Sequence, residues 1–347
     1  MKSETLFRPL SSGMDSSERL ALLGLSFVEF LSPGEKHTLI KEFGSAAQIF
    51  EHSRADLSSV LCRKMITDQW VPQRLLSQAR ETERLLTGGS LGCIFYGDST
   101  YPPQLREIFD PPVTLFHRGT LPDNGHTLAG IVGTRFPTGG ARRAAYRLGF
   151  ELALEGVGVV SGLARGIDRE SHEGCVEAGG YSIAVLGSGI DRIYPESSRA
   201  AGQRLLKAGG AILSEYPPGT PPLHWHFPAR NRIISGLCRS VVVVQAPERS
   251  GALITAEYAL DQGRDLYVHA AGLAGTAGAG TRRLSESGAP VIRGAHEIMR
   301  DWGREPRQTG RSEAPASERT GERLSRLLKD EMEGSCTVKG GEIYWRQ

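Results

Sequence analysis

From Leu128 onward, short runs rich in valine and isoleucine alternate with helical segments, and this alternation constrains the fold more than any other feature. Buried strands of a parallel sheet have such continuous β-branched runs. We expect strands at Ala129–Val132, Gly158–Val160, Ser182–Leu186, Ala211–Leu213, Val241–Gln245, Leu266–Val268 and Pro290–Ile292. We expect helices at Gly140–Leu154, Arg169–Glu177, Ser197–Leu206, Arg230–Leu237, Ala252–Asp261 and Thr281–Ser287. The alternation predicts right-handed crossovers and a doubly wound, mostly parallel α/β sheet.

A different pattern precedes this region. Residues 17–87 contain short helical segments separated by glycine turns, which predict a small all-α domain that follows a flexible N-terminus at 1–16. SAM-like and helix-hairpin-helix modules also consist of short helices joined by glycine turns. A helical spacer without a binding role is the alternative. The expected helices start near Ser17 and continue at Pro33–Phe43, Ala46–Phe50, Asp56–Leu61 and Val71–Leu86.

The remaining segments complete the predicted organisation. Cys93–Tyr96 and Val113–His117 read as strands that pack onto the α/β domain, so we place that domain at 88–302. Residues 303–317 are polar and rich in proline and glycine, as a linker is. Residues 318–347 predict a helix and a hairpin around Gly340-Gly341, a short α+β tail resembling a reduced winged helix.

Composition limits the possible functions. The formal net charge is only +2, so any nucleic-acid binding must come from a local basic patch. The five cysteines form no CxxC pair, and no histidines have metal-ligand spacing, so we expect no disulfide framework, metal or cofactor. Neither a membrane span nor a signal peptide is evident. We therefore expect a cytoplasmic protein without a membrane partner.

Small residues and arginines follow several predicted strands. In Val157–Asp168, a strand leads through a glycine loop and Arg165 to Asp168, which we expect to cap the next helix. Ligands of such folds bind beyond the carboxyl ends of the parallel strands. The residues that follow the other predicted strands therefore belong to the same candidate site. These residues are Gly133-Thr134-Arg135, Gly187-Ser188-Gly189, Ser214-Glu215-Tyr216 and Arg249-Ser250-Gly251. The pattern favours a site for a long or multiple anion.

The densest functional segment is His224–Arg232, which combines aromatic rings with two arginines and an asparagine. Aromatic rings stack on bases, and arginines bind phosphates or stack as cations. We expect Arg230, Asn231 and Arg232 in the first turn of a helix, where arginine opposes the helix dipole unless an anion lies nearby. In the alternative, the aromatic rings cover the sheet and one arginine pairs with Glu215. Arg142, Arg143 and Arg147 either extend this basic surface or form a solvated helix face.

The sequence gives little support for catalysis. The glycine pattern at Gly187-x-Gly189 lacks the third glycine of a dinucleotide fingerprint, and there is no Walker sequence. No acidic residue near a strand end pairs recognisably with a histidine or serine nucleophile. We therefore expect a binding protein and not an enzyme.

Five ordered motifs, GLARGID, AVLGSGIDRIYP, SEYPPGTPP, FPARNRIISGL and SGALITAEYALDQGR, resemble those of the DprA/Smf family of DNA-processing proteins. The resemblance runs from about Tyr101 to Ile292. It implies an extended Rossmann-like domain that binds single-stranded DNA, dimerises, protects incoming strands and helps load the RecA recombinase during natural transformation. By the same resemblance, the DNA-binding residues would be Arg135, Arg165, Gly187, Ser188, Gly189, Phe227, Arg230, Asn231, Arg232, Ser250 and Gly251.

One alternative belongs to another class of protein. The sheet architecture also resembles the lysine-decarboxylase-like nucleoside-monophosphate phosphoribohydrolases, which use a glutamate in a PGGxGTxxE motif to cleave a glycosidic bond. The corresponding turn here, Arg249–Glu257, keeps Glu257 but lacks the Pro-Gly-Gly. Enzymatic cleavage through Glu257 is therefore the minority hypothesis.

Overall fold

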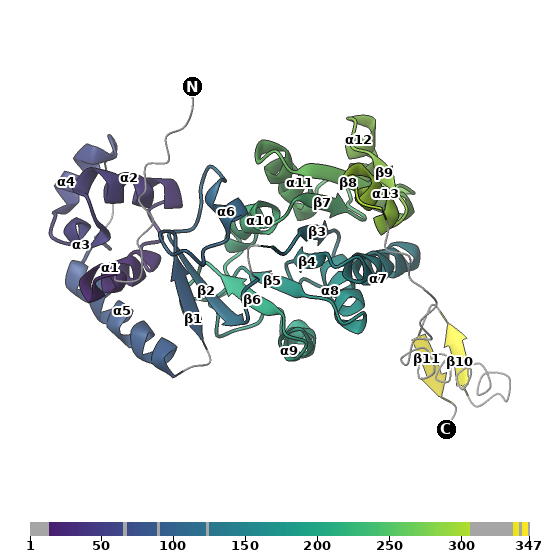
Figure 1. Ribbon diagram of the computed structural model, residues 1–347, viewed down its shortest axis with the longest axis horizontal. Coiled ribbons are helices and arrows are strands. Elements are labelled where there is room, and N and C mark those ends of the chain that lie inside the picture. The colour runs from purple at the N-terminus through teal and green to yellow at the C-terminus, as the bar shows by residue number, and fades with distance from the viewer. Residues whose placement is uncertain are drawn as a thin grey trace. The chain divides into compact units, whose positions relative to one another are not determined.

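The computed structural model describes residues 14–64, 68–88, 91–122, 125–305, 336–339 and 342–345 (Figure 1). By its internal contacts the chain divides into two units, Met1–Ile298 and Met299–Gln347. The predicted N-terminal tail lies almost wholly outside the described residues. The boundary that we predict between the helical domain and the α/β domain stays a prediction.

Five helices form the first part of the larger unit: α1 (Ser16–Ser26), α2 (Pro33–Phe43), α3 (Ala46–Ile49), α4 (Arg54–Val60) and α5 (Pro72–Thr87). Serines begin three of them. Ser32, Ser45 and Ser53 each accept a hydrogen bond from a backbone N–H in the first turn of α2, α3 and α4. Such caps satisfy amides that the helix itself leaves unpaired, which is why these short helices begin where they do.

The sheet of the larger unit has nine strands among the described residues, in the order β1-β2-β6-β5-β4-β3-β7-β8-β9. The strands are β1 (Gly92–Phe95), β2 (Thr114–Gly119), β3 (Leu128–Val132), β4 (Gly158–Ser161), β5 (Ser182–Leu186), β6 (Ala211–Ser214), β7 (Ser240–Val243), β8 (Asp265–His269) and β9 (Val291–Ile292). The β1–β2 and β2–β6 pairs are antiparallel, and the other pairs are parallel. The predicted doubly wound, mostly parallel fold is confirmed.

Helices cover both faces of this sheet: α6 (Pro103–Arg106), α7 (Gly139–Leu154), α8 (Ile167–Glu177), α9 (Arg199–Lys207), α10 (His226–Gly236), α11 (Gly251–Asp261), α12 (Ala279–Glu286) and α13 (Ala295–Asp301). Crossovers α7, α8 and α9 lead step by step from β3 to β6, whereas α10, α11 and α12 lead from β6 to β9 in the opposite direction (Figure 1). Because crossovers are right-handed, the two series cover opposite faces. The direction changes at the β3–β7 pair, where such folds bind ligands.

Successive residues of β5 point to opposite faces and join two different cores. Ala184 and Leu186 belong to the core that also contains the buried leucines of α1 and α2. Ile183 and Val185 belong to the core shared with α10 and α11. The N-terminal helices are therefore joined to the sheet by a continuous apolar contact.

The early starts of α8 and α10 change the roles that the sequence predicts for residues there. Helix α10 starts at His226, so Arg230, Asn231 and Arg232 lie in its second turn, and our argument from the helix dipole is wrong for them. Helix α8 starts at Ile167 after Gly166, so Asp168 is inside the helix and does not cap it. Tertiary contacts of the Asp168 carboxylate, described below, replace the predicted capping role.

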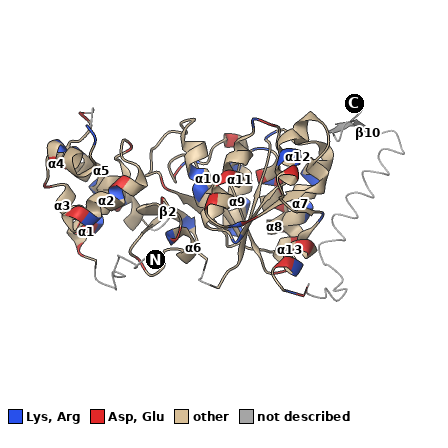
Figure 2. Cartoon of the chain, turned by 90° about the horizontal axis from the view of Figure 1, so that it is seen from above, with Lys and Arg blue, Asp and Glu red and all other residues tan. Residues whose placement is uncertain are grey.

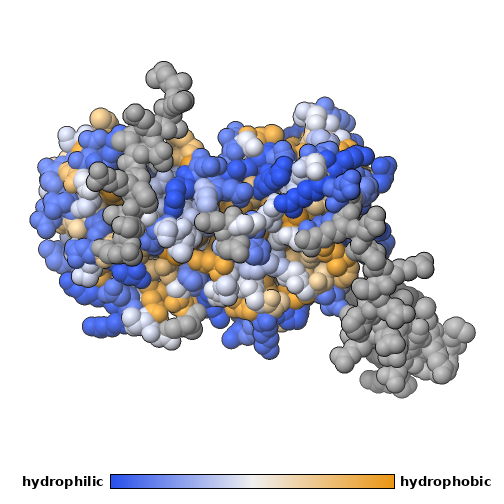
Figure 3. All heavy atoms as spheres, in the orientation of Figure 1, coloured by the Kyte–Doolittle hydropathy of each residue, from blue (hydrophilic) through white to orange (hydrophobic). Residues whose placement is uncertain are grey.

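The smaller unit contains a hairpin of β10 (Cys336–Lys339) and β11 (Glu342–Trp345), as the terminal residues predict. The predicted linker from residue 306 and the predicted helix at 318–333 lie outside the described residues. None of the described helices is long and apolar enough to cross a membrane. On the face of Figure 3, hydrophobic residues reach the surface in separate patches among hydrophilic ones.

Helices α7 and α8 touch through two glycines. A methyl group added at Gly174 of α8 would overlap the carbonyl oxygen of Tyr146, and one at Gly149 of α7 would overlap that of Ser171. Because these neighbours are backbone atoms, neither glycine has room for a side chain.

We expect Gly174→Ala to lower the free energy of unfolding by about 1–3 kcal/mol, the usual cost of overpacking a close contact. Urea unfolding of the purified protein measures this loss. Gly140→Ala is the matched control, because Gly140 lies on the same pair of helices with no atom near its added methyl group. Equal stability of the two variants would contradict the close contact.

Candidate functional site

A cavity of about 560 Å³ opens at the β3–β7 switch point, beyond the carboxyl ends of the strands. We call it the strand-end cavity. It is lined by residues that follow three strands and by residues of α10 and the loop before it. These are Gly133–Phe136 after β3, Ala164 and Asp168 after β4, Pro247 and Arg249–Ala252 after β7, and Phe227, Pro228, Arg230 and Asn231 of α10, with Tyr194, Pro222 and His224 among the rest. In Figure 2, basic residues of α10 lie in the middle of the α/β part.

The loop after β3 presents Arg135 and Phe136 to this cavity. Thr134 anchors the loop: its N–H donates to the carbonyl of Gln245 over 2.7 Å, and its hydroxyl accepts from the N–H of Phe136 over 3.2 Å. Thr138 then caps α7 through Ala141. Arg135 is exposed and the Phe136 side chain is 81% exposed, so both are free to meet a ligand.

Arg230 is the buried cation of the cavity, with 5% of its surface exposed. Its Nη1 donates to the carbonyls of Gly162 over 3.1 Å and of Val185, and its Nε donates to Oδ1 of Asn231 over 3.0 Å. A side chain at Gly162 would collide with the guanidinium, which explains the glycine after β4. Burial lowers the pKa of Arg230 to about 10, with Arg135 acting in the same direction against Asp168.

Asp168 provides the nearby negative charge. Its Oδ2 accepts a hydrogen bond from the N–H of Gly162 over 3.1 Å, and the residue is 6% exposed. Burial raises the pKa of Asp168, while Arg230 and the backbone hydrogen bond oppose that rise. A carboxylate beside a desolvated guanidinium offsets the cost of burying each charge. The strand-end cavity thus has a buried guanidinium, Arg230, under the influence of the buried Asp168 carboxylate, and an exposed arginine, Arg135.

Aromatic rings gather around the two arginines. The ring centre of Phe227 lies 5.8 Å from the guanidinium carbon of Arg135 and 6.0 Å from that of Arg230. The ring of Tyr194, 44% exposed, lies 5.7 Å from Phe227 at an angle of 46°. Gly187 passes directly behind Phe227, since an added methyl group would lie 3.0 Å from Cδ1 of the ring. Cations over aromatic faces suit the stacking of flat ligands.

Six predicted site residues line the strand-end cavity: Arg135, Phe227, Arg230, Asn231, Ser250 and Gly251. Asn231 donates to the carbonyl of Gly251 over 3.2 Å, and Ser250 caps α11 through Ala252. The structure therefore brings together residues from three separate motifs.

The other five predicted site residues lie elsewhere. Arg165 is exposed outside the cavity, where its Nε donates to the hydroxyl of Ser197 over 3.2 Å. Gly187, Ser188 and Gly189 follow β5 and do not line the strand-end cavity. The Ser188 hydroxyl donates to the carbonyl of Arg192, and the N–H of Gly189 donates to the carbonyl of Thr220. Arg232 points to a second cavity and forms the ion pair with Glu215 that we considered as the alternative.

Two aromatic lining residues were missed by our sequence analysis, Phe136 and Tyr194. Phe136 directly follows Arg135 at a strand end, and this was a usable signal. Tyr194 lies far from any strand end in the sequence, and only the folded loop brings it to Phe227.

Glu257 does not line the strand-end cavity. It is exposed on α11, two residues after the last lining residue, Thr255, and so on a different side of the helix. The structure thus gives no support to glycosidic cleavage through Glu257. Within the described part of the chain, no group of three or more metal-ligating side chains is present.

Comparison with known proteins identifies the class. The family model described as DNA recombination-mediator protein A matches residues 92–303. The chain is 42% identical over 203 residues to the DNA processing protein DprA of Bacillus subtilis, covering 58% of this chain and 68% of that one. It is 40% identical over 199 residues to Protein Smf of Escherichia coli, covering 57% of this chain and 53% of that one, about half of that relative's length.

Solved structures agree. The X-ray structure of DprA from Streptococcus pneumoniae is similar with a TM-score of 0.67 and 29% identity, covering 83% of this chain and 99% of that one. A structure from Helicobacter pylori, described as showing a single-stranded DNA binding mode of DNA processing protein A, has a TM-score of 0.55 and 27% identity. It covers 61% of this chain and 95% of that one. The fold is Rossmann-like, and the chain belongs to the DNA recombination-mediator protein A family, DprA/Smf.

His172 lies behind Arg230 and provides a test of the buried charge. It is 1% exposed, and its Nδ1 lies 2.8 Å from the hydroxyl of Ser182. That hydroxyl donates to the carbonyl of Val159, so we assign the proton to Nδ1 of the imidazole. Burial, helped by the charge of Arg230, lowers the pKa of His172 to about 3.

We expect His172 to make the fold sensitive to acid. Below the ordinary pKa of histidine, the unfolded chain binds a proton that the folded chain excludes, so stability decreases as the pH falls. Between about pH 6.5 and 5 the loss is about 2 kcal/mol for one such group. Urea unfolding at several pH values measures it. His172→Asn keeps a donor to Ser182 but no titrating ring, so an unchanged pH slope in this variant would refute the assignment.

Proposed function

We propose that this protein binds single-stranded DNA in the strand-end cavity, protects incoming strands and helps load RecA during natural transformation. The cluster of Phe227 with the guanidinium groups of Arg135 and Arg230, which lie 5.8 and 6.0 Å from its ring centre, carries the proposal. Single strands are bound without strong sequence preference by basic grooves in which bases stack on aromatic rings. Membership of the DprA/Smf family and the likeness to the Helicobacter pylori protein support it.

The geometry favours unpaired over paired DNA. Phe136, Tyr194 and Phe227 offer ring faces or edges within one cavity, and a base inside a duplex has no free face for them. The exposed guanidinium of Arg135 is placed to contact the phosphate backbone, whereas Arg230 is held by backbone carbonyls and organises the cavity. We therefore assign backbone contact to Arg135 and base stacking to Phe227.

The wider role includes two partners, RecA and a second copy of this chain, and a cytoplasmic setting. The family supports these assignments, and the free cysteines among the described residues fit a reducing compartment. We also propose that the protein has no catalytic activity, because the strand-end cavity combines binding groups without a paired base and nucleophile.

Replacement of the two ligand-facing residues tests the binding site. We expect Phe227→Leu to weaken binding of oligo-dT by about 5- to 150-fold, the range for one lost stacking contact. We expect Arg135→Ala to weaken binding too, and to reduce the slope of log affinity against log salt by about 0.7. Fluorescence anisotropy at two salt concentrations measures both effects.

The control for these variants is Arg80→Ala, because Arg80 is an exposed arginine of α5 outside the cavity. Arg165→Ala separates the resemblance from the observed geometry: we expect a smaller loss than for Arg135→Ala. Unchanged oligo-dT binding in both Phe227→Leu and Arg135→Ala would overturn the proposed site. Equal affinity of the wild-type protein for duplex DNA would overturn stacking as its basis.

RecA loading needs its own assay. We expect the protein to speed the onset of RecA's DNA-dependent ATP hydrolysis on single strands already covered by a single-strand-binding protein. The Phe227→Leu variant should fail to do so at concentrations where it no longer binds DNA. Normal acceleration by that variant would separate RecA loading from the strand-end cavity.

A further inference from the structure

A second cavity, of about 310 Å³, lies on the other side of α10. We call it the helix-side cavity, because its wall includes the end of α1 and the start of α2. The two cavities share the segment that begins α10. His224, Phe227 and Arg230 line the strand-end cavity, whereas Trp225, His226 and Arg232 line the helix-side cavity. The function proposed above leaves this second group of residues unused.

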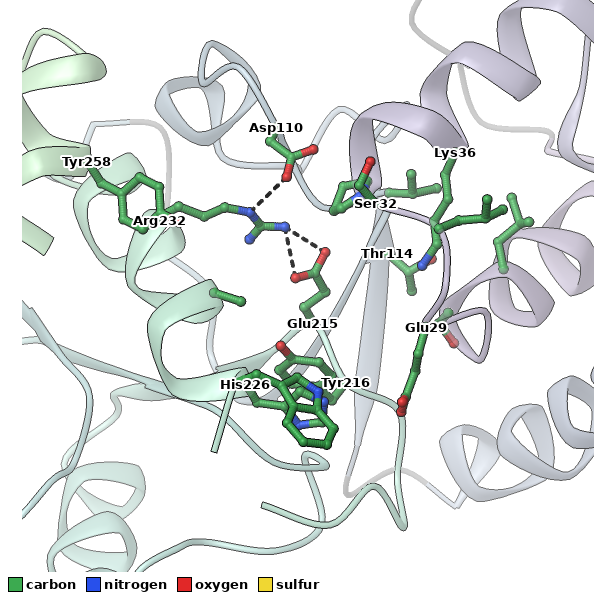
Figure 4. A pocket seen from close by; sticks show the side chains of 17 residues that line it. Glu29, Ser32, Lys36, Asp110, Thr114, Glu215, Tyr216, His226, Arg232 and Tyr258 are labelled. Atoms are coloured by element: carbon green, nitrogen blue, oxygen red, sulfur yellow. Dashed lines mark hydrogen bonds and ion pairs between the residues drawn. The ribbon is translucent and has the colours of Figure 1, made fainter. Parts of the chain in front are cut away.

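Two of the three guanidinium nitrogens of Arg232 face carboxylates in this cavity. Its Nη2 donates to both carboxylate oxygens of Glu215 over 2.8 Å each, and its Nε lies 3.5 Å from Oδ2 of Asp110 (Figure 4). Burial opposes the charge of Arg232, but Glu215 and Asp110 outweigh burial and raise its pKa. Its Nη1 is buried without a hydrogen-bond partner in the described structure. Arg232 therefore closes one side of the cavity and is not an open cation.

Lys36 is the cation without a partner. The residue is 9% exposed and lines the cavity, and no hydrogen bond or ion pair joins it to any described residue. Figure 4 shows its amine directed from α2 toward Thr114, into the space between Glu215 and Glu29. The hydroxyl of Thr114 already donates to the carbonyl of Leu22. Among the described residues the Lys36 amine has no protein acceptor, and it opens to the cavity, so a ligand oxygen there is able to accept a hydrogen bond from it.

The charges around the cavity exclude a strongly anionic ligand. Lys36 and Arg232 face Asp110, Glu215 and the exposed Glu29, so the carboxylates outnumber the cations. A phosphate group would meet this negative excess at short range. The missing acceptor is therefore better supplied by an uncharged carbonyl oxygen, and Glu29 at the rim is free to accept from an N–H.

Part of the remaining wall is aromatic. The rings of Tyr216 and His226 stack with centroids 3.8 Å apart at an angle of 23°, and Trp225 is 53% exposed beside them. Such faces favour a flat ligand. A ring that carries a carbonyl oxygen next to an N–H matches all three features of the cavity.

We propose that the helix-side cavity accepts one unpaired nucleobase with a carbonyl next to a ring N–H, as in guanine, thymine or uracil. The carbonyl oxygen accepts a hydrogen bond from the amine of Lys36, and the ring N–H donates to the carboxylate of Glu29. The aromatic wall formed by Trp225, Tyr216 and His226 packs against the base. Adenine carries no carbonyl and forms this pattern poorly.

The proposal rests on the proposed function for the source of the base. A helix with its side chains is about 10–12 Å across, and stacked bases are about 3.4 Å apart, so about three or four nucleotides cross α10. A strand bound in the strand-end cavity is thus able to place a later base in the helix-side cavity. A free nucleoside has the same recognition chemistry and is the other source.

The test uses the full chain and oligonucleotides of about 12 nucleotides, either all dA or with single dT replacements along the dA strand. For the wild-type protein we expect at least one dT position to improve binding by about tenfold, within the range for one specific base contact. Lys36→Met removes the donor and keeps an apolar stem, so we expect it to abolish that improvement and leave all-dA binding unchanged. Arg135→Ala should weaken both oligonucleotides equally.

Glu29→Gln is the second variant, because Glu29 is exposed and its replacement leaves the core intact. It replaces a carboxylate by an amide, so we expect a smaller dT improvement. Quenching of tryptophan fluorescence by thymidine, compared with Trp225→Phe, tests the free nucleoside. Quenching that depends on Trp225 and Lys36 supports a free nucleoside, and dT improvement without such quenching supports a base within a strand.

Three results would overturn the proposal. The first is equal binding of dT-containing and all-dA strands by the wild-type protein. The second is an unchanged dT improvement in both Lys36→Met and Glu29→Gln. The third is stabilisation by inorganic phosphate that disappears in Lys36→Met, because it identifies an anion site. In each of these three results the wild-type protein still binds oligonucleotides, so only the proposal for the helix-side cavity fails. If the proposed function itself is wrong, the wild-type protein binds none of the oligonucleotides.

Discussion

The buried guanidinium of Arg230 is the contact on which the rest of the site depends. It joins the ends of β4 and β5 by donating to the carbonyls of Gly162 and Val185, and Asn231 beside it extends the link to Gly251 of α11. Parallel strands end with unpaired backbone carbonyls, and a planar group with five donors is suited to collect them. The Arg230 side chain thus fixes the relative positions of the strand ends that surround the strand-end cavity.

Helix α10, which carries Arg230, separates two cavities whose charge balance is opposite. On one side, Arg135 and Arg230 face a single carboxylate, Asp168, so that cavity suits the phosphate backbone of a strand. On the other side, carboxylates outnumber cations, and Lys36 lacks an acceptor. Residues 224–232 alternate between these sides because a helix turns by about 100° per residue. Residues 224–232 therefore contribute side chains to both cavities.

Much of the fold was predictable from the sequence, because strands buried on both faces must be apolar throughout. The runs at Ser182–Leu186 and Ala129–Val132 show this, and the strands there have nearly the predicted bounds. The strand ends also placed Arg135, Ser250 and Gly251 correctly at one cavity, since the rule concerns topology alone. The start of α10 was not predictable, because His226 begins the helix without a side-chain cap. The side on which Arg232 lies and its pairing with Glu215 depend on that start.

The glycine contact between α7 and α8 limits how the site proposed for single strands is able to adapt to bases of different size. With backbone packed directly on backbone at Gly149 and Gly174, these two helices have no side-chain layer that is able to rearrange. In the proposed function, adaptation to purines or pyrimidines is therefore expected from the rotamers of exposed side chains at the strand-end cavity, such as Arg135 and Phe136, and not from this pair of helices.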